Sequence, residues 1–291
     1  MEAMVKNLSS TAELLAVAAH SDTVAQWDQE TLHRAFHWAL YCEHVYNRFH
    51  SNPYSALCFS DLPRCQHLLL HGLLHNVHAP ISIMKILYDR PTDLHKNQDR
   101  YQDVKGLAEL LLNKLDAVLK QTDGAHCANQ FLDCVLQGCD EAREDLCVIV
   151  AAALQTELTP QLNFILDWLA LKPDLLEHMC HSLSSSLLTD IAKRHLRFRD
   201  VYSDVLKKWA KEMEYDINNS EWIQVGRNPA VSFQKLTEQF VSLFKGSVSL
   251  RDHVETELKA LKSDAGDFDV RGLSVWGDLL SEIHKKCPCH S

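Results

Sequence analysis

FRDVYSDVLKKWAKEM, residues 198–213, is the stretch that decides the class of fold. Its large apolar side chains recur three or four residues apart: Val201, Tyr202, Val205, Leu206, Trp209 and Met213. The charged side chains lie largely on the opposite side: Asp204, Lys207, Lys208 and Lys211. Residues three and four apart share one face of an α-helix, whereas a strand alternates with a period of two. The spacing therefore predicts an amphipathic helix with one buried face.

The same helical pattern extends outward in both directions. In TPQLNFILDWLALKP (159–173), Thr159 fits the N-cap, Pro160 the first helical position and Pro173 the stop. Asp28 precedes a long amphipathic run, and Ser274 can cap a short last helix. EWIQV (221–225) is the one stretch with strand-like alternation, and it is too isolated to build a sheet. The chain therefore reads as helical from end to end.

The composition supports an all-α fold. The chain has 9 glycines and 8 prolines among 291 residues, so few residues suit the tight turns of a β-sandwich or barrel. Helices with short connections favour antiparallel helix pairs stacked side by side. The length fits one elongated domain or two lobes. The polar stretch 91–106 is the expected break, which gives an N-terminal helical region (1–105) and a C-terminal helical-repeat domain (106–291).

The charge balance argues against direct binding to nucleic acid. Lys and Arg number 29 and Asp and Glu 39, so the net charge is −10 and the chain as a whole lacks the cations that neutralise phosphates. KRHLRFR (193–199) is the one basic run, and it reads either as a nuclear-import or nucleic-acid patch or as cations at a helix C-terminus. The second reading is favoured.

No membrane segment or signal peptide is expected. The longest apolar run, LCVIVAAAL (146–154), is too short to span a bilayer, and the first residues lack a basic start followed by a long apolar core. The ten cysteines contain no CxxC spacing. We therefore expect an intracellular protein with reduced thiols.

Two clusters raise the alternative of a metal-binding helical protein. HLLLHGLLHNVH places four imidazoles on one helical arc, at His67, His71, His75 and His78. The chain also ends in CPCHS, with Cys287, Cys289 and His290 close together. No Asp, Glu or Cys joins the histidine arc, and Pro288 places the tail beyond the last helix. Solvated histidines and a frayed end are the favoured readings, so no metal ligand is predicted.

Catalytic motifs are missing from the sequence. GxSxG, GxxxxGK[ST], GxGxxG and HExxH do not occur, and nine scattered glycines supply no phosphate-binding loop. The expectation is a protein that is not an enzyme and needs no cofactor.

Three blocks carry a resemblance to a known family. They are ELLAVAAHSDTVAQWDQETLHRAFHWALYCEHVYNRF (13–49), VYSDVLKKWAKEMEYDINNSEWIQV (201–225) and GDFDVRGLSVWGDLL (266–280). In sequence and in order they resemble the Fanconi anemia complementation group F family, with weaker similarity between them. The likeness covers nearly the whole chain.

The resemblance implies a HEAT-like helical adaptor without catalytic residues. Such an adaptor would belong to the nuclear Fanconi anemia core complex, a ubiquitin ligase that monoubiquitinates its substrate in DNA interstrand crosslink repair. It would bridge the complementation group C and E proteins on one side and the group A and G proteins on the other. Contact with DNA would be indirect, through the complex, and the protein would be located in the nucleus.

Three aromatic residues are the predicted partner-binding anchors. Trp and Tyr dominate interface hot spots, and Trp27, Tyr215 and Trp222 lie outside the clear helical stripes. The alternative is that each tryptophan fills a seam between neighbouring helices of its own chain.

Overall fold

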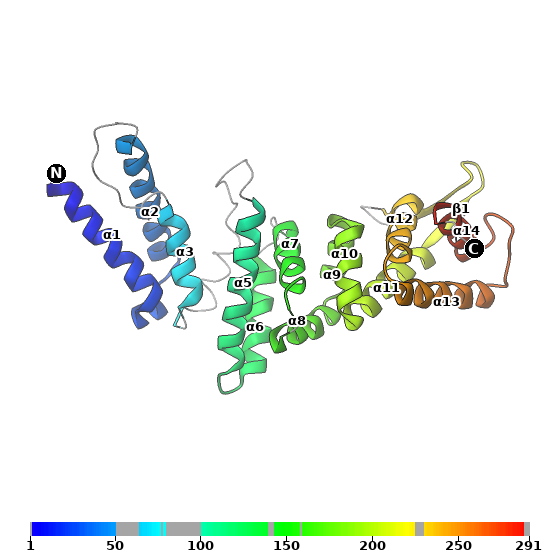
Figure 1. Cartoon of the computed structure of the whole chain (residues 1–291), viewed down its shortest axis with the longest axis horizontal. Helices are drawn as coiled ribbons and strands as arrows, with labels where there is room; N and C mark the ends of the chain where they lie inside the picture. The colour runs from blue at the N-terminus through cyan, green and yellow to red at the C-terminus, as the bar shows by residue number, and fades with distance from the viewer. Residues whose placement is uncertain are drawn as a thin grey trace. The chain divides into compact units, whose positions relative to one another are not determined.

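The computed structural model describes residues 2–50, 64–76, 78–79, 100–138, 143–157, 159–224 and 230–287, and every structural statement below concerns these residues. They form thirteen α-helices, one 3-10 helix and two short strands (Figure 1). The prediction of an all-α fold is confirmed. The finer expectation, antiparallel helix pairs stacked as a HEAT-like repeat, stays a prediction.

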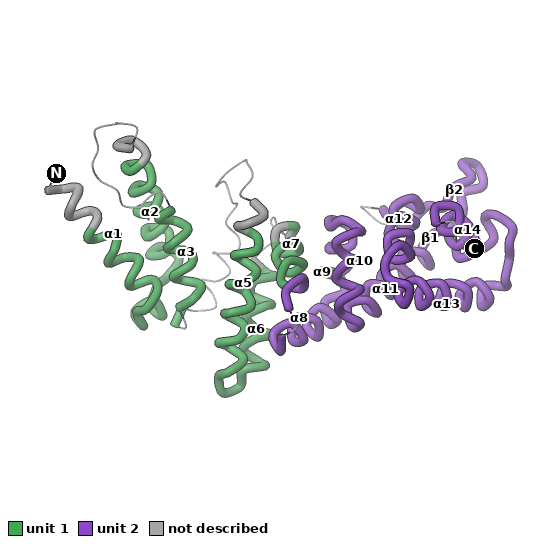
Figure 2. The backbone as a smooth tube through the Cα atoms, in the orientation of Figure 1, with its two compact units in different colours: residues 1–153 green, residues 154–291 purple. Residues whose placement is uncertain are grey.

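The contacts between residues divide the chain into two compact units, 1–153 and 154–291 (Figure 2). Most of the polar stretch 91–106 lies outside the described residues, and helix α5 already begins at Arg100. The predicted division into 1–105 and 106–291 is therefore untested and stays a prediction.

Unit 1 is built around helix α3. Its elements are α1 (Glu2–His20), η1 (Asp22–Gln26), α2 (Gln29–His50), α3 (Cys65–His75), α5 (Arg100–Leu119), α6 (Gly124–Gly138) and α7 (Arg143–Leu154). Helix α3 packs against α1, α2 and α5, and α5 packs against α6. As predicted, Asp28 caps α2, since its Oδ1 accepts a hydrogen bond of 2.8 Å from the Thr31 amide.

Buried polar groups join the helix ends of unit 1. The Asn76 side chain, just after α3, donates to the carbonyls of Ala18 (3.1 Å) and Ser21 (2.8 Å) at the end of α1. The Lys114 ammonium donates to the Asn76 carbonyl at 2.9 Å. Burial lowers the pKa of Lys114 to about 8, because its partners are neutral carbonyls and not carboxylates.

Unit 2 is built around helix α11, and its elements run from α8 to α14. They are α8 (Pro160–Ala170), α9 (Pro173–Ser182), α10 (Ser185–Arg194), α11 (Leu196–Lys211), β1 (Met213–Asp216), β2 (Glu221–Gln224), α12 (Phe233–Phe244), α13 (Val248–Asp264) and α14 (Val275–Lys286). Helix α11 packs against α8, α9, α10, α12 and α14. Of the predicted apolar stripe, Tyr202, Val205, Leu206 and Trp209 are buried and Val201 is half-buried, and Phe198 is buried with them. This stripe forms the centre of the unit's core.

Two details of the sequence reading are wrong. The helix ends at Lys211, so Met213 begins strand β1 and does not extend the helical stripe. EWIQV is not isolated, because Glu221–Gln224 pairs antiparallel with Met213–Asp216. A tight connection with Ser220 at φ 52° lets the chain fold back on itself directly after α11. The result is a two-stranded hairpin within the helical unit.

None of the helices that the structure describes combines the length and the apolar composition that a membrane crossing requires.

Candidate functional site

The hairpin of residues 213–224 has two distinct faces. Residues directly opposite each other in an antiparallel pair point to the same side, and successive residues alternate. The inner face of the hairpin consists of the pairs Met213 with Gln224 and Tyr215 with Trp222. The outer face of the hairpin consists of the pairs Glu214 with Ile223 and Asp216 with Glu221.

The inner face is fastened to the start of α14. Trp222, only 9% exposed, donates its indole N–H to Asp278 Oδ2 at 2.7 Å. The same oxygen accepts the Gly272 amide at 2.8 Å. One carboxylate therefore joins the hairpin, the loop before α14 and α14 itself.

Tyr215 completes this attachment. Its ring meets the Trp222 ring edge to face, with centroids 5.3 Å apart. Gly272 has φ +84°, and a Cβ at this position would lie 2.5 Å from the Tyr215 ring. Only glycine allows both the backbone angle and this close approach. Two of the sequence blocks, 201–225 and 266–280, therefore meet here.

The outer face carries negative charge that no cation of the described chain neutralises. The segment 213–224 holds three acidic residues and no basic one. Asp216 lies directly opposite Glu221, where like charges are unfavourable. Among the described residues, neither of these carboxylates nor that of Glu214 forms an ion pair. Arg271 donates to the Ser220 carbonyl, not to a carboxylate of the outer face, at 3.3 Å.

Local hydrogen bonds keep Asp216 ionised. The side chain of Asn219 donates to it at 2.6 Å and the amide of Asn218 at 2.9 Å. These bonds, with that of Asn219 the larger influence, lower the pKa of Asp216 below its ordinary value. Asp216 therefore stays negatively charged at neutral pH.

Exposed apolar side chains gather around the same hairpin. In the described part of the chain nine large apolar side chains are exposed, and five of them lie on the hairpin or on the loop 266–273: Ile217, Ile223, Phe268, Val270 and Leu273. Ile217 at the turn is 82% exposed and Ile223 on the outer face 41%. Apolar side chains concentrated in this way are typical of a surface that binds another protein.

The structure places the three predicted anchors as follows. Tyr215 and Trp222 lie on the inner face and contact their own chain. Trp27 is half-buried at the end of η1, where its amide donates to the Val24 carbonyl at 3.0 Å. Their contact with a partner stays a prediction. The sequence reading missed the outer face, although the alternation of acidic and aromatic residues in EYD marks the two sides of a strand.

The histidine stripe is shorter than predicted. His67, His71 and His75 are exposed on α3, with neighbouring ring centroids 6.4 and 4.0 Å apart, but His78 follows the end of the helix. Partial burial, then the neighbouring imidazoles, lower the pKa of His71. In the described ranges no three metal-binding side chains are arranged to hold an ion. Of the predicted alternative at the tail, Cys289 and His290 lie outside the described residues.

Only part of the basic run 193–199 lies at a helix C-terminus as predicted, because Arg197 and Arg199 belong to the start of α11. Helix α10 ends at Arg194, with Lys193 and Arg194 in its last turn. Lys193 pairs with Asp190 at 2.9 Å, Arg199 with Asp200 at 3.1 Å, and Arg197 with Asp167. Carboxylates of the same chain therefore neutralise much of this run.

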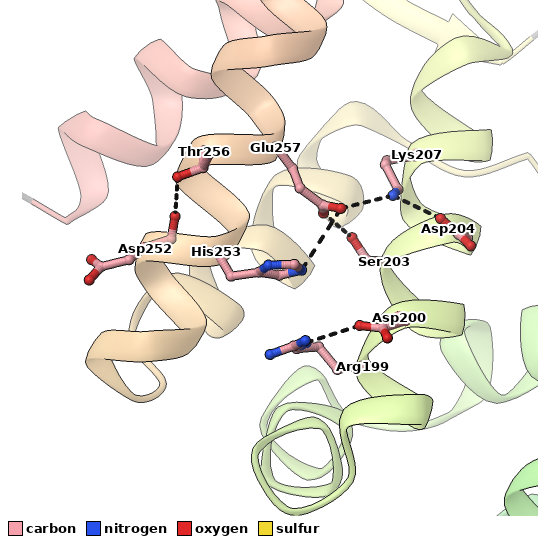
Figure 3. Close-up of polar contacts among 9 residues, drawn as sticks. All are labelled: Arg199, Asp200, Ser203, Asp204, Lys207, Asp252, His253, Thr256 and Glu257. Atoms are coloured by element: carbon pink, nitrogen blue, oxygen red, sulfur yellow. Dashed lines mark hydrogen bonds and ion pairs between the residues drawn. The ribbon is translucent and has the colours of Figure 1, made fainter.

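A polar cluster of Ser203, Asp204, Lys207, His253 and Glu257 joins α11 to α13 (Figure 3). Glu257 accepts hydrogen bonds from Ser203 at 3.0 Å and Lys207 at 3.3 Å, and it lies 3.8 Å from His253 Nε2. Lys207 also pairs with Asp204 at 2.8 Å. Burial alone would lower the pKa of Lys207, but the bond to Asp204 and the charge of Glu257 raise it. Both carboxylates of the cluster, those of Glu257 and Asp204, therefore contact the ammonium of Lys207.

Comparison with known proteins gives one consistent family. The family model of the Fanconi anemia group F protein matches residues 1–56 and 82–283. The Homo sapiens protein described as "Fanconi anemia group F protein" is 26% identical to this chain, with 96% of the chain and 94% of the relative covered. The Mus musculus protein of the same description is 27% identical, with 96% and 97% covered. The match spans both compact units.

Proposed function

Because the chain belongs to the Fanconi anemia group F protein family, we propose that it is a non-catalytic adaptor of the nuclear Fanconi anemia core complex. The adaptor holds the complementation group C and E proteins on one surface and the group A and G proteins on another. In this way it supports monoubiquitination of the substrate by the ubiquitin ligase during DNA interstrand crosslink repair. It reaches DNA only through the complex.

The observation that carries this proposal is the extent of the family match. It covers residues of both units, and the relatives align over nearly their full length. A chain that holds two partners at once raises the effective concentration of each for the other. That mechanism requires binding surfaces for the two partners and no catalytic side chains. The outer face of the hairpin is one such surface, since Glu214, Glu221 and Ile223 are exposed on it.

The test uses the full chain in cells whose own copy of the gene is disrupted. The tagged chain should co-purify with the group A, C, E and G proteins from nuclear extract. It should also restore monoubiquitination of the substrate after treatment with a crosslinking agent. A chain that retains none of these proteins, in cells whose core complex assembles without it, would contradict the adaptor function.

A further inference from the structure

We propose that the outer face of the hairpin docks a segment of a protein partner in which basic side chains flank large apolar ones. This inference rests on the proposed adaptor function and specifies the partner's chemistry. The surface consists of Glu214, Asp216, Glu221 and Ile223, with Ile217 at the turn.

The charge of the partner segment follows from the unbalanced carboxylates. The register places Asp216 opposite Glu221 and Glu214 opposite Ile223, so three negative charges surround one apolar side chain. Like charges directly opposite in a hairpin are unfavourable, and no cation of the described chain pairs with them. Lys or Arg side chains from outside would neutralise them. Complementary charge of this kind steers association and fixes its register.

The apolar part of the segment follows from the exposed isoleucines. Ile217 and Ile223 are exposed although both are among the most apolar residue types. Burial of such side chains provides much of the driving force in protein association. A purely basic, polar segment would leave them in water. The partner segment should therefore carry apolar side chains between its basic ones.

The surface is prepared in advance for binding. Hydrogen bonds from Trp222 and Gly272 to Asp278, and the contact of Tyr215 with Gly272, hold the inner face in place. The outer side chains therefore extend from a backbone that is already fixed. Binding therefore costs the hairpin less conformational entropy than it would cost a flexible loop.

Two other occupants fit less well. A nucleic acid would bring phosphates against three carboxylates. A second copy of this chain would meet the same face across a two-fold axis, so acidic side chains would oppose acidic ones. A basic, apolar segment is the occupant whose chemistry matches the surface.

The test compares charge variants of the full chain. In Glu214→Lys/Glu221→Lys the outer face loses its attraction for a basic segment, and we expect at least about tenfold weaker retention of one core-complex protein. Glu214→Gln/Glu221→Gln should have an intermediate effect. The matched control is Glu238→Lys, an exposed acidic position on α12 whose side chain, among the described residues, bonds only to Gln234. Circular dichroism and urea unfolding verify that each variant is folded.

The apolar contribution has its own pair of variants. Ile217→Asp should weaken retention of the same protein, while Leu171→Asp should not, because Leu171 is similarly exposed (74%) but lies at the end of α8. Zero-length carbodiimide crosslinking joins carboxylates to lysines and identifies the bound segment. We expect crosslinks from Glu214 or Glu221 to a partner lysine that has apolar neighbours.

The outcomes separate this inference from the adaptor function. If the wild-type chain retains no core-complex protein, the adaptor function itself fails. If the wild-type chain and the Lys variant retain every partner equally, only the proposed docking on the outer face is overturned. Crosslinks from Glu214 or Glu221 to a lysine of a second copy of this chain would also overturn it.

Discussion

The α11–α13 interface and the outer face of the hairpin differ in how their carboxylates are paired. At the interface, Glu257 meets Ser203, Lys207 and His253, so its negative charge is compensated within the chain (Figure 3). On the outer face, Asp216 and Glu221 oppose each other without a cation in the described residues. The first arrangement holds two helices of one unit together. The second leaves two like charges opposed, so it is the one we assign to binding.

The largest expected loss of stability comes from a change on the inner face of the same hairpin. Trp222→Ala removes a buried ring and its bond to Asp278, and should lower the free energy of unfolding by about 3–5 kcal/mol. Ile223→Ala, one position away on the outer face, should cost well under about 1 kcal/mol because the side chain is exposed. Urea unfolding measures both. Equal losses would mean that the two faces are not distinct.

Lys114 adds a third arrangement, a buried cation that no carboxylate of the described residues pairs with. Its pKa is about 8 in the folded chain against 10.5 in the unfolded one. Between these values the folded chain has released a proton that the unfolded chain still holds, so raising the pH favours folding. From pH 8 to pH 9.5 the free energy of unfolding should gain about 2 kcal/mol from this group.

The control for this effect is Lys114→Met, which keeps a similar volume and cannot titrate. The gain between pH 8 and pH 9.5 should be missing from the variant when the two proteins are unfolded in urea side by side. The same pH dependence in both proteins would show that Lys114 is charged in the folded state throughout this range.

A smaller loss of unfolding free energy is expected at the polar cluster between α11 and α13. Glu257→Gln keeps the shape of the side chain but removes its charge, so Lys207 retains only Asp204 as an anionic partner. We expect a loss of about 1 kcal/mol because the groups are partly exposed. High salt should reduce the difference between the wild-type and variant unfolding free energies. A neutral result in low salt would show that the cluster does not stabilise the interface.

The smallest expected effect is an increase in the free energy of unfolding. Glu221→Lys converts the pair with Asp216 from repulsive to attractive and should raise the free energy of unfolding by about 0.2–1 kcal/mol. Glu238→Lys on α12 gains no such partner and is the control. If Glu221→Lys destabilises the chain, the carboxylate has a favourable contact and the contrast with Glu257 disappears.

The regular helices could be predicted from the sequence because their evidence is local. The period of the apolar residues in 198–213 gave the buried stripe of α11, and Asp28 and Ser274 gave two helix starts with their caps. In each case the residues that decide the structure lie within one or two turns of one another. Local interactions of this kind are visible in a short window of sequence.

The hairpin could not be predicted in the same way. Its pairing depends on where α11 ends, and no residue between Trp209 and Glu214 is a strong helix breaker. Trp222 was a reasonable anchor for a partner by residue type, but its actual partner, Asp278, is 56 positions away. Because strand residues alternate, an error about which side is buried reverses the assignment of every side chain. The sequence therefore indicated this segment but not its outer face.

The central claim is that the outer face carries charge for a partner and not for the fold. One comparison tests it directly: the Glu214→Lys/Glu221→Lys chain and the wild type, measured for unfolding free energy and for retention of core-complex proteins. The account predicts that stability is unchanged or higher while one partner is lost. A variant that is less stable but retains every partner would contradict it.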